Sequence, residues 1–297
     1  ERVKAGIPYK AMLQEVGILG AAIIATIMVL GFGGAVGMST WLSIAIIVIL
    51  VAIFGFYVRS LGQPLFIFLL LIMLPLATTE LGTDSWITEL VNPVMAKIGV
   101  NGGWVLVYTA FLMMVLRFSA GPIVEKLQPI GLLAVCSVIA IAGLLLLSTT
   151  AGIMIFVAAT IYGIGKSFFW PTMLGVVAER FPKGGALTMN AIAGMGMLSV
   201  GIVGAVWLGS IQDKSMDKML STANPALHEQ VVAEEKASLF GAYSPLDQEK
   251  ILVLPESDKL IISDVAADAK KKALATVAVF PTIMLVCYLI LIFYFRM

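Results

Sequence analysis

Charged residues are scarce in this chain. Only 12% of its 297 residues are charged, whereas 60% are hydrophobic and the mean hydropathy is +1.02. Ordinary soluble domains have about 25% charged residues, so this composition excludes a water-soluble fold. The formal net charge is only +1, which gives no reason to expect nucleic acid as a partner.

Cysteine and histidine are also rare. Cys136 and Cys287 lie inside long apolar runs, so neither a disulfide framework nor a metal cluster is expected. The single histidine, His228, falls in the most polar stretch, which excludes histidine acid–base chemistry within a membrane. No stretch resembles a phosphate-binding loop, and this disfavours direct ATP hydrolysis. We therefore expect no enzymatic activity and no cofactor.

Long apolar runs, in contrast, recur along the whole chain. A bilayer core of about 30 Å needs roughly 20 apolar residues in a helix. Runs of this kind lie near residues 16–37, 41–58, 64–84, 103–123, 130–149, 152–178, 186–209 and 273–295. We therefore predict an all-α integral membrane protein with about eight transmembrane helices.

Basic residues in the short loops predict the orientation of these spans. With residues 1–15 as a basic cytoplasmic linker, the basic positions that fall on the cytoplasmic side are Arg59, Arg117, Lys126, Arg180, Lys183 and Arg296. The short loops of the opposite side hold only Lys97. We expect a plasma membrane location, namely a bacterial inner membrane. The chain begins at Glu1 without an initiator methionine or a signal peptide, so we expect a fragment.

Residues 211–272 interrupt the apolar pattern. This stretch carries Pro225, Pro245 and Pro255 and is rich in charge. It is expected to be an extracytoplasmic loop insert with short helical pieces near 226–239 and 263–272.

The loop between the fourth and fifth predicted spans contains Gly121, with Glu125 four positions and Lys126 five positions after it. This spacing resembles the cytoplasmic signature of the major facilitator superfamily, Gly-x-x-x-Asp-Arg-x-Gly-Arg-Lys, although Gln128 replaces its second glycine. The resemblance implies that Gly121 lets two helices approach closely. It also implies that Glu125 and Lys126, with Arg117 before them, latch neighbouring helix ends in one conformation. An ordinary polar turn is the alternative.

A second stretch resembles the same superfamily more closely. Residues 169–172 read Phe-Trp-Pro-Thr, and residues 179–186 read Glu-Arg-Phe-Pro-Lys-Gly-Gly-Ala. They are similar to the proline-bent tenth helix and the turn that follows it, most nearly in bacterial sugar-transporting branches. The resemblance implies that Pro171 bends the sixth span and that Glu179 and Arg180 belong to the latch. The glycines between residues 194 and 209 would form a closely packed seam.

The resemblance covers a six-helix C-terminal half, residues 64–210 and 273–297. It implies an N-terminal helix bundle that this chain lacks. The helices within 16–63 depart from the standard fold, in which a long loop joins the two halves. They are either an extra pair inserted between the halves, as in proton-coupled peptide transporters, or the last two helices of the N-terminal half. We favour the inserted pair because residues 1–15 resemble an interdomain linker.

Charges inside the predicted spans are candidate functional residues, because a charge in hydrocarbon is costly. Glu80 and Asp84 lie in the third span and Lys166 lies near the middle of the sixth. At about 1.5 Å per residue, Glu80 lies about 9 Å and Asp84 about 15 Å from the centre of the third span. At these depths a Lys166–Glu80 pair is within side-chain reach, whereas a Lys166–Asp84 pair is not obvious.

Two further residues are candidates for a substrate pathway. Trp170, beside Pro171, could present an aromatic face to a ring, and Asn190 lies near the start of the seventh span. With Lys166, Glu80 and Asp84 they predict a secondary transporter of a small polar solute, a sugar being one candidate, coupled to a proton or cation. The alternatives are a membrane-embedded transferase-type enzyme, and a scaffold or receptor that acts through residues 211–272.

Overall fold

The computed structural model describes residues 6–84, 86–88, 92, 95, 99, 101, 103–233 and 244–296. Its described elements are helices, with one isolated bridge between Val232 and Leu246. Seven helices are long and apolar enough to cross a membrane, or eight if Trp104–Phe118 and Ala120–Leu127 form one bent span. The all-helical fold and the approximate number of apolar spans are therefore confirmed.

The helices follow the predicted runs, with breaks inside several of them. In chain order they are α1 (Tyr9–Ala35), α2 (Thr40–Val58), α3 (Pro64–Ala77), η1 (Thr78–Gly82), α5 (Trp104–Phe118), α6 (Ala120–Leu127), α7 (Pro129–Thr149), α8 (Met154–Lys166), α9 (Phe169–Arg180), α10 (Ala186–Leu198), η2 (Ser199–Gly204), α11 (Ala205–Ala223), α12 (Pro225–Val231), α13 (Gln248–Leu252), α14 (Glu256–Val277) and α15 (Val279–Arg296). The segments η1 and η2 are π-helical, a wide turn that is frequent at functional sites.

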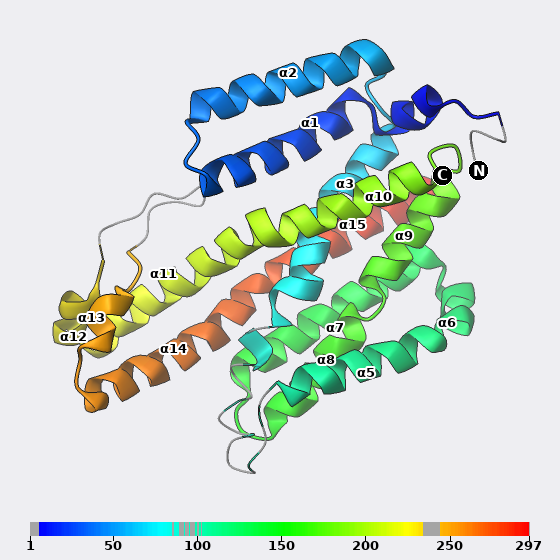
Figure 1. Cartoon of the computed structure of the whole chain (residues 1–297). Coiled ribbons are helices and arrows are strands. Elements are labelled where there is room, and N and C mark those ends of the chain that lie inside the picture. The colour runs from blue at the N-terminus through cyan, green and yellow to red at the C-terminus, as the bar shows by residue number, and fades with distance from the viewer. Residues whose placement is uncertain are drawn as a thin grey trace.

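The helices from α3 onward share one hydrophobic core. Helix α7 packs against α8, α9 and α15, and α3 packs against α10, α9 and α15. The largest fully buried side chains of this core include Phe66, Leu69, Met73, Leu133, Tyr162, Phe169 and Tyr288. Helix α5 lies at the edge of the bundle beside α8 (Figure 1).

Helices α1 and α2 form a hairpin on the side of the bundle away from α5 (Figure 1). Helix α1 packs on α10, α3 and η2, whereas α2 contacts chiefly α1 and leaves Trp41 and Phe56 exposed. Among the described residues, neither helix contributes a hydrogen bond or ion pair to Lys166.

Residues 1–15 are not wholly a linker, because α1 begins at Tyr9. Met12 and Val16 are buried, so this first part of the helix packs rather than spans solvent. The helix then breaks at Gly17, whose φ is 64°. The break is joined to the α2–α3 connection by hydrogen bonds from Ile18 N to Ser60 O (2.8 Å) and from Gln63 N to Glu15 O (3.0 Å).

We predict that Gly17→Ala destabilises this joint. A Cβ at Gly17 would lie 2.0 Å from the backbone nitrogen of Gly62, and the positive φ disfavours any side chain. Overpacking of this kind costs about 1–3 kcal/mol, so the Tm of the purified protein should fall by several degrees. The matched control is Gly34→Ala in the same helix, where a Cβ meets nothing within 4 Å. An equal Tm for the two variants would contradict the prediction.

The insert is not a loop with short helical pieces. Helix α11 continues the seventh span to Ala223, and α14 begins at Glu256 and leads into α15. The two helices project beyond the bundle as a hairpin that α12 and α13 close (Figure 1). The hairpin has its own apolar core, made by Met216, Leu220, Leu227, Val231, Ile262 and Ala269. The sequence did not reveal these long helices, because their apolar residues occupy only one stripe of each helix and the rest of the stretch is rich in charge. Of the helical piece expected near 226–239, residues 226–231 lie in α12, and residues 234–239 are outside the described residues.

We predict that this hairpin, closed by α12 and α13, lies on the opposite face of the membrane from α6. Figure 1 places α12 and α13 at one end of the bundle and α6 at the other. In a Cys287→Ser background, Ser257→Cys on intact cells should react with a membrane-impermeant maleimide. The matched position, Glu125→Cys on α6, should react only after permeabilisation. Both Ser257 and Glu125 are exposed, and the remaining Cys136 is buried. Labelling of both positions on intact cells would contradict the topology.

Candidate functional site

The sixth predicted span is broken into two helices. Helix α8 ends at Lys166 and α9 begins at Phe169. In a continuous helix residue 171 would donate to the carbonyl of Ser167, but Pro171 has no N–H and its ring clashes with that carbonyl. The break therefore lies one turn before Pro171 rather than at it, and it frees the Ser167 carbonyl.

Arg117 fills this gap. Its Nε donates to the Ser167 carbonyl at 2.8 Å, and its Nη2 donates to Oε1 of Glu80 at 3.0 Å. The other oxygen of Glu80, Oε2, accepts from the backbone N–H of Trp170 at 2.9 Å. The Glu80 carboxylate thus lies at the N-terminus of α9, where the helix dipole favours a negative charge.

Lys166 pairs with Asp84, and the side chain of Glu80, which the sequence placed within its reach, is not its partner. The Lys166 ammonium donates to Oδ1 of Asp84 and, at 3.1 Å, to the backbone carbonyl of Glu80. Two features explain the difference. The Glu80 carboxylate is occupied by Arg117, and the π-turn of η1 adds a residue to the turn, which brings Asp84 closer to the level of Glu80.

The wide turn that carries Glu80 is held by hydroxyl groups. Pro75 lies in the last turn of α3, and the hydroxyl of Thr79 donates to the Pro75 carbonyl at 2.7 Å. Tyr162 of α8 reaches across, with its hydroxyl 2.8 Å from that of Thr83 and hydrogen-bonded to the carbonyl of Thr79. Tyr162, Thr83 and Ser167 were not predicted from the sequence, because neither a hydroxyl group nor a free backbone carbonyl gives a signal of its own there.

The four charged side chains balance one another. Glu80 and Asp84 carry two negative charges, and Arg117 and Lys166 carry two positive charges. Lys166 and Glu80 are almost fully buried, with 3% and 4% of the side chain exposed, whereas Asp84 is 31% and Arg117 41% exposed. The cluster therefore has a buried side and an open side. A solute could meet it only through Asp84 and Arg117.

The side chains of the other two pathway candidates, Trp170 and Asn190, do not join this cluster. The Trp170 ring packs over Gly196 of α10, where an added Cβ would lie 2.7 Å from the ring, so only its backbone N–H contacts Glu80. Asn190 is exposed on α10, and no described hydrogen bond joins its side chain to the cluster.

Arg117 lies in the last turn of a helix rather than in a free loop. It ends α5, and the chain continues as α6 with a bend of 65° before it turns at Gln128. Its contact with Ser167 places the guanidinium against the break between α8 and α9, with 41% of the side chain still exposed.

The remaining latch residues lie in two places. A Cβ at Gly121 would meet nothing within 4 Å, so the expected close helix approach is wrong for this conformation. Glu125 and Lys126 are exposed on α6 and form no ion pair within the described residues.

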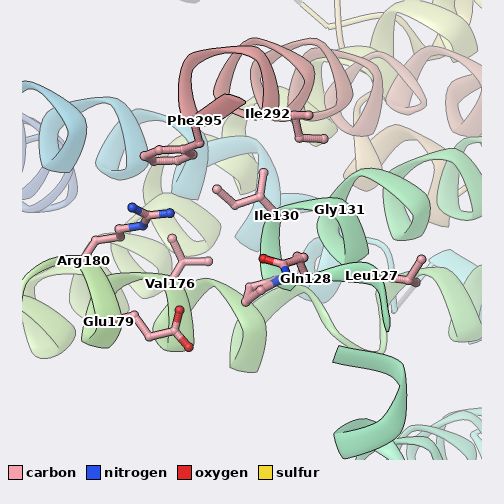
Figure 2. A pocket seen from close by; sticks show the side chains of 10 residues that line it. Leu127, Gln128, Ile130, Gly131, Val176, Glu179, Arg180, Ile292 and Phe295 are labelled. Atoms are coloured by element: carbon pink, nitrogen blue, oxygen red, sulfur yellow. The ribbon is translucent and has the colours of Figure 1, made fainter. Parts of the chain in front are cut away.

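Glu179 and Arg180 end α9 and line a pocket of about 360 Å³ between α6, α7, α9 and α15 (Figure 2). Their role as a latch stays a prediction.

Among the glycines expected to form a seam, two lie at close contacts. A Cβ at Gly196 would overlap Trp170 and Met73, and one at Gly204 would lie 2.7 Å from the hydroxyl of Thr78. Gly194 and Gly201 have open space instead. The seam is therefore confined to the points where α10 and η2 face α9 and η1.

The chain was compared with protein-family models, curated proteins and solved structures. No family model, no curated protein and no solved structure matches it.

Proposed function

We propose that this chain is part of a secondary transporter that moves a small polar solute by alternating access. The observation that carries the proposal is the broken α8–α9 helix, with a charge-balanced cluster at the break that is open at Asp84 and Arg117. Discontinuous helices near the bilayer midplane are where transporters bind substrates and coupling ions. Ionisable residues within spans are costly to bury, and they often mark such pathways.

The superfamily is part of the same proposal. The turn after α9 and the proline within it resemble the C-terminal half of the major facilitator superfamily, so the helices from α3 onward would form one rocking bundle. The missing N-terminal bundle would face the open side of the charged cluster. A sugar is one candidate solute, a proton or cation would couple its movement, and the setting would be a bacterial inner membrane.

Solute counterflow in vesicles tests the proposal. The full-length protein is reconstituted in proteoliposomes, each loaded with one unlabelled polar solute, and entry of the same radiolabelled solute is measured. A carrier exchanges label for the trapped solute without net flux, whereas a receptor or scaffold does not. Entry no faster than in empty vesicles across sugars, amino acids and organic acids would contradict a transport function.

A receptor or scaffold role is the second candidate, and the hairpin formed by α11 to α14 favours it. The hairpin has its own core and leaves Leu252 and Val253 exposed, at 73% and 83%. Exposed apolar side chains away from the membrane are typical of protein contacts. This role leaves the charged cluster unexplained, which is why we rank it second.

A further inference from the structure

The pocket between α7, α9 and α15 lies at the end of the bundle, where three chain segments turn or stop. Arg180 ends α9, Phe295 lies at the end of α15, and Gln128 forms the turn into α7. Its inner wall is apolar and includes Ile130, Val176 and Ile292 (Figure 2). Ends of apolar spans lie at the headgroup level of a bilayer, so the pocket opens where lipid headgroups are.

Two of the described residues that line the pocket are charged. The Arg180 guanidinium stacks on the Phe295 ring, 3.8 Å from its centroid, and forms no ion pair within the described residues. Stacking fixes the plane of the guanidinium and leaves its N–H edge available, which suits a phosphate. Figure 2 shows the Glu179 carboxylate on the other side of Val176 from this guanidinium.

We infer that this pocket binds the headgroup of a zwitterionic aminophospholipid, with the phosphate on Arg180 and the primary ammonium on Glu179. The charges of the described lining residues sum to zero, so a headgroup of one negative and one positive charge leaves them balanced. An anionic headgroup would meet repulsion from Glu179. A quaternary ammonium, as in phosphatidylcholine, has no N–H to donate to that carboxylate. The apolar wall takes the glycerol end of the lipid, which a water-borne phosphate lacks. This site is separate from the proposed transport pathway.

Lipid retention and thermal stability test the inference. The protein is reconstituted in nanodiscs of phosphatidylcholine alone, or of phosphatidylcholine mixed with phosphatidylethanolamine. Native mass spectrometry then counts the retained lipids, and Tm is measured in both. We expect selective retention of phosphatidylethanolamine and a higher Tm in the mixed discs, because a ligand of the folded state stabilises it. Arg180→Gln and Glu179→Gln should each reduce that retention several-fold and remove the difference in Tm.

Arg59→Gln is the matched control, because Arg59 also lies over a phenylalanine ring, Phe56 at 5.4 Å, but lines no such pocket. It should keep the full lipid preference. For each variant the result is the difference in lipid retention and in Tm between the two kinds of nanodisc. A general loss of stability lowers Tm in both and does not change this difference. An unchanged preference in both pocket variants, or equal retention of phosphatidylcholine, would overturn the site. Equal protection by soluble phosphoethanolamine in phosphatidylcholine discs would overturn the lipid assignment.

Discussion

Replacing Lys166 by alanine is expected to reduce solute uptake by more than about tenfold while the protein still inserts in the membrane. The change leaves Asp84 and the Glu80 carbonyl without the ammonium that both contact. Removing one partner of a buried ion pair costs about 3–5 kcal/mol, enough to displace the side chains around it. Insertion survives, because it depends on the hydrophobicity of whole spans.

The double variant Lys166→Ala, Asp84→Asn separates a pathway role from a purely structural one. Removing both charges restores neutrality, so Tm should recover relative to Lys166→Ala alone. Uptake should stay low, because the charges that a solute or coupling ion meets are gone. Lys166→Arg keeps the charge but changes its shape, so partial activity is expected. Lys183→Ala, at an exposed loop position, is the control. Normal uptake by Lys166→Ala at equal protein levels would remove Lys166 from the mechanism.

Arg117→Ala is expected to have the second large effect, a loss of uptake together with a lower Tm. Arg117 serves two acceptors that have no other side-chain donor in the described contacts, the Ser167 carbonyl and Oε1 of Glu80. Each unsatisfied buried group costs about 1–3 kcal/mol, and more where it is charged. Arg117→Lys can reach only one acceptor at a time, so it should recover part of the Tm.

Glu80→Gln completes this test. The amide keeps a carbonyl oxygen for Trp170 N–H or for Arg117 but removes the charge. If the ion pair matters for transport, Arg117→Ala combined with Glu80→Gln should regain Tm but not uptake. Arg59→Gln, an exposed arginine at the end of α2, is the control and should behave as the native protein. Native uptake in Arg117→Ala would return this residue to the role of an ordinary loop charge.

The sequence predicted the spans well because hydrophobicity over about 20 residues is a signal that neighbours in space do not alter. The starts of α2, α3, α7 and α10 all fall within one residue of the predicted runs. Proline and apolar composition also indicated an interruption in the sixth span. These features depend on local chemistry, which a single sequence displays directly.

The pairing within the cluster could not be predicted in the same way. The partner of Lys166 depends on the π-turn after Pro75, and no residue pattern marks that turn in advance. Arg117 was assigned to a loop because a basic residue after an apolar run is typical of a span end. Its true position follows from the gap that Pro171 opens on a different helix, which is tertiary information.

The long helices of the hairpin have a mechanical consequence. Residues Ala186–Ala223 form one continuous helical rod of 38 residues, and Glu256–Phe295 form another of 40. At about 1.5 Å per residue each rod is roughly 60 Å long, so a small tilt at the hairpin tip becomes a displacement inside the bundle. The first rod contains η2, which lies against the wide turn that carries Glu80 through the contact of Gly204 with Thr78. A tilt of the hairpin is therefore expected to reach the backbone that positions Glu80, because the same helix contacts both.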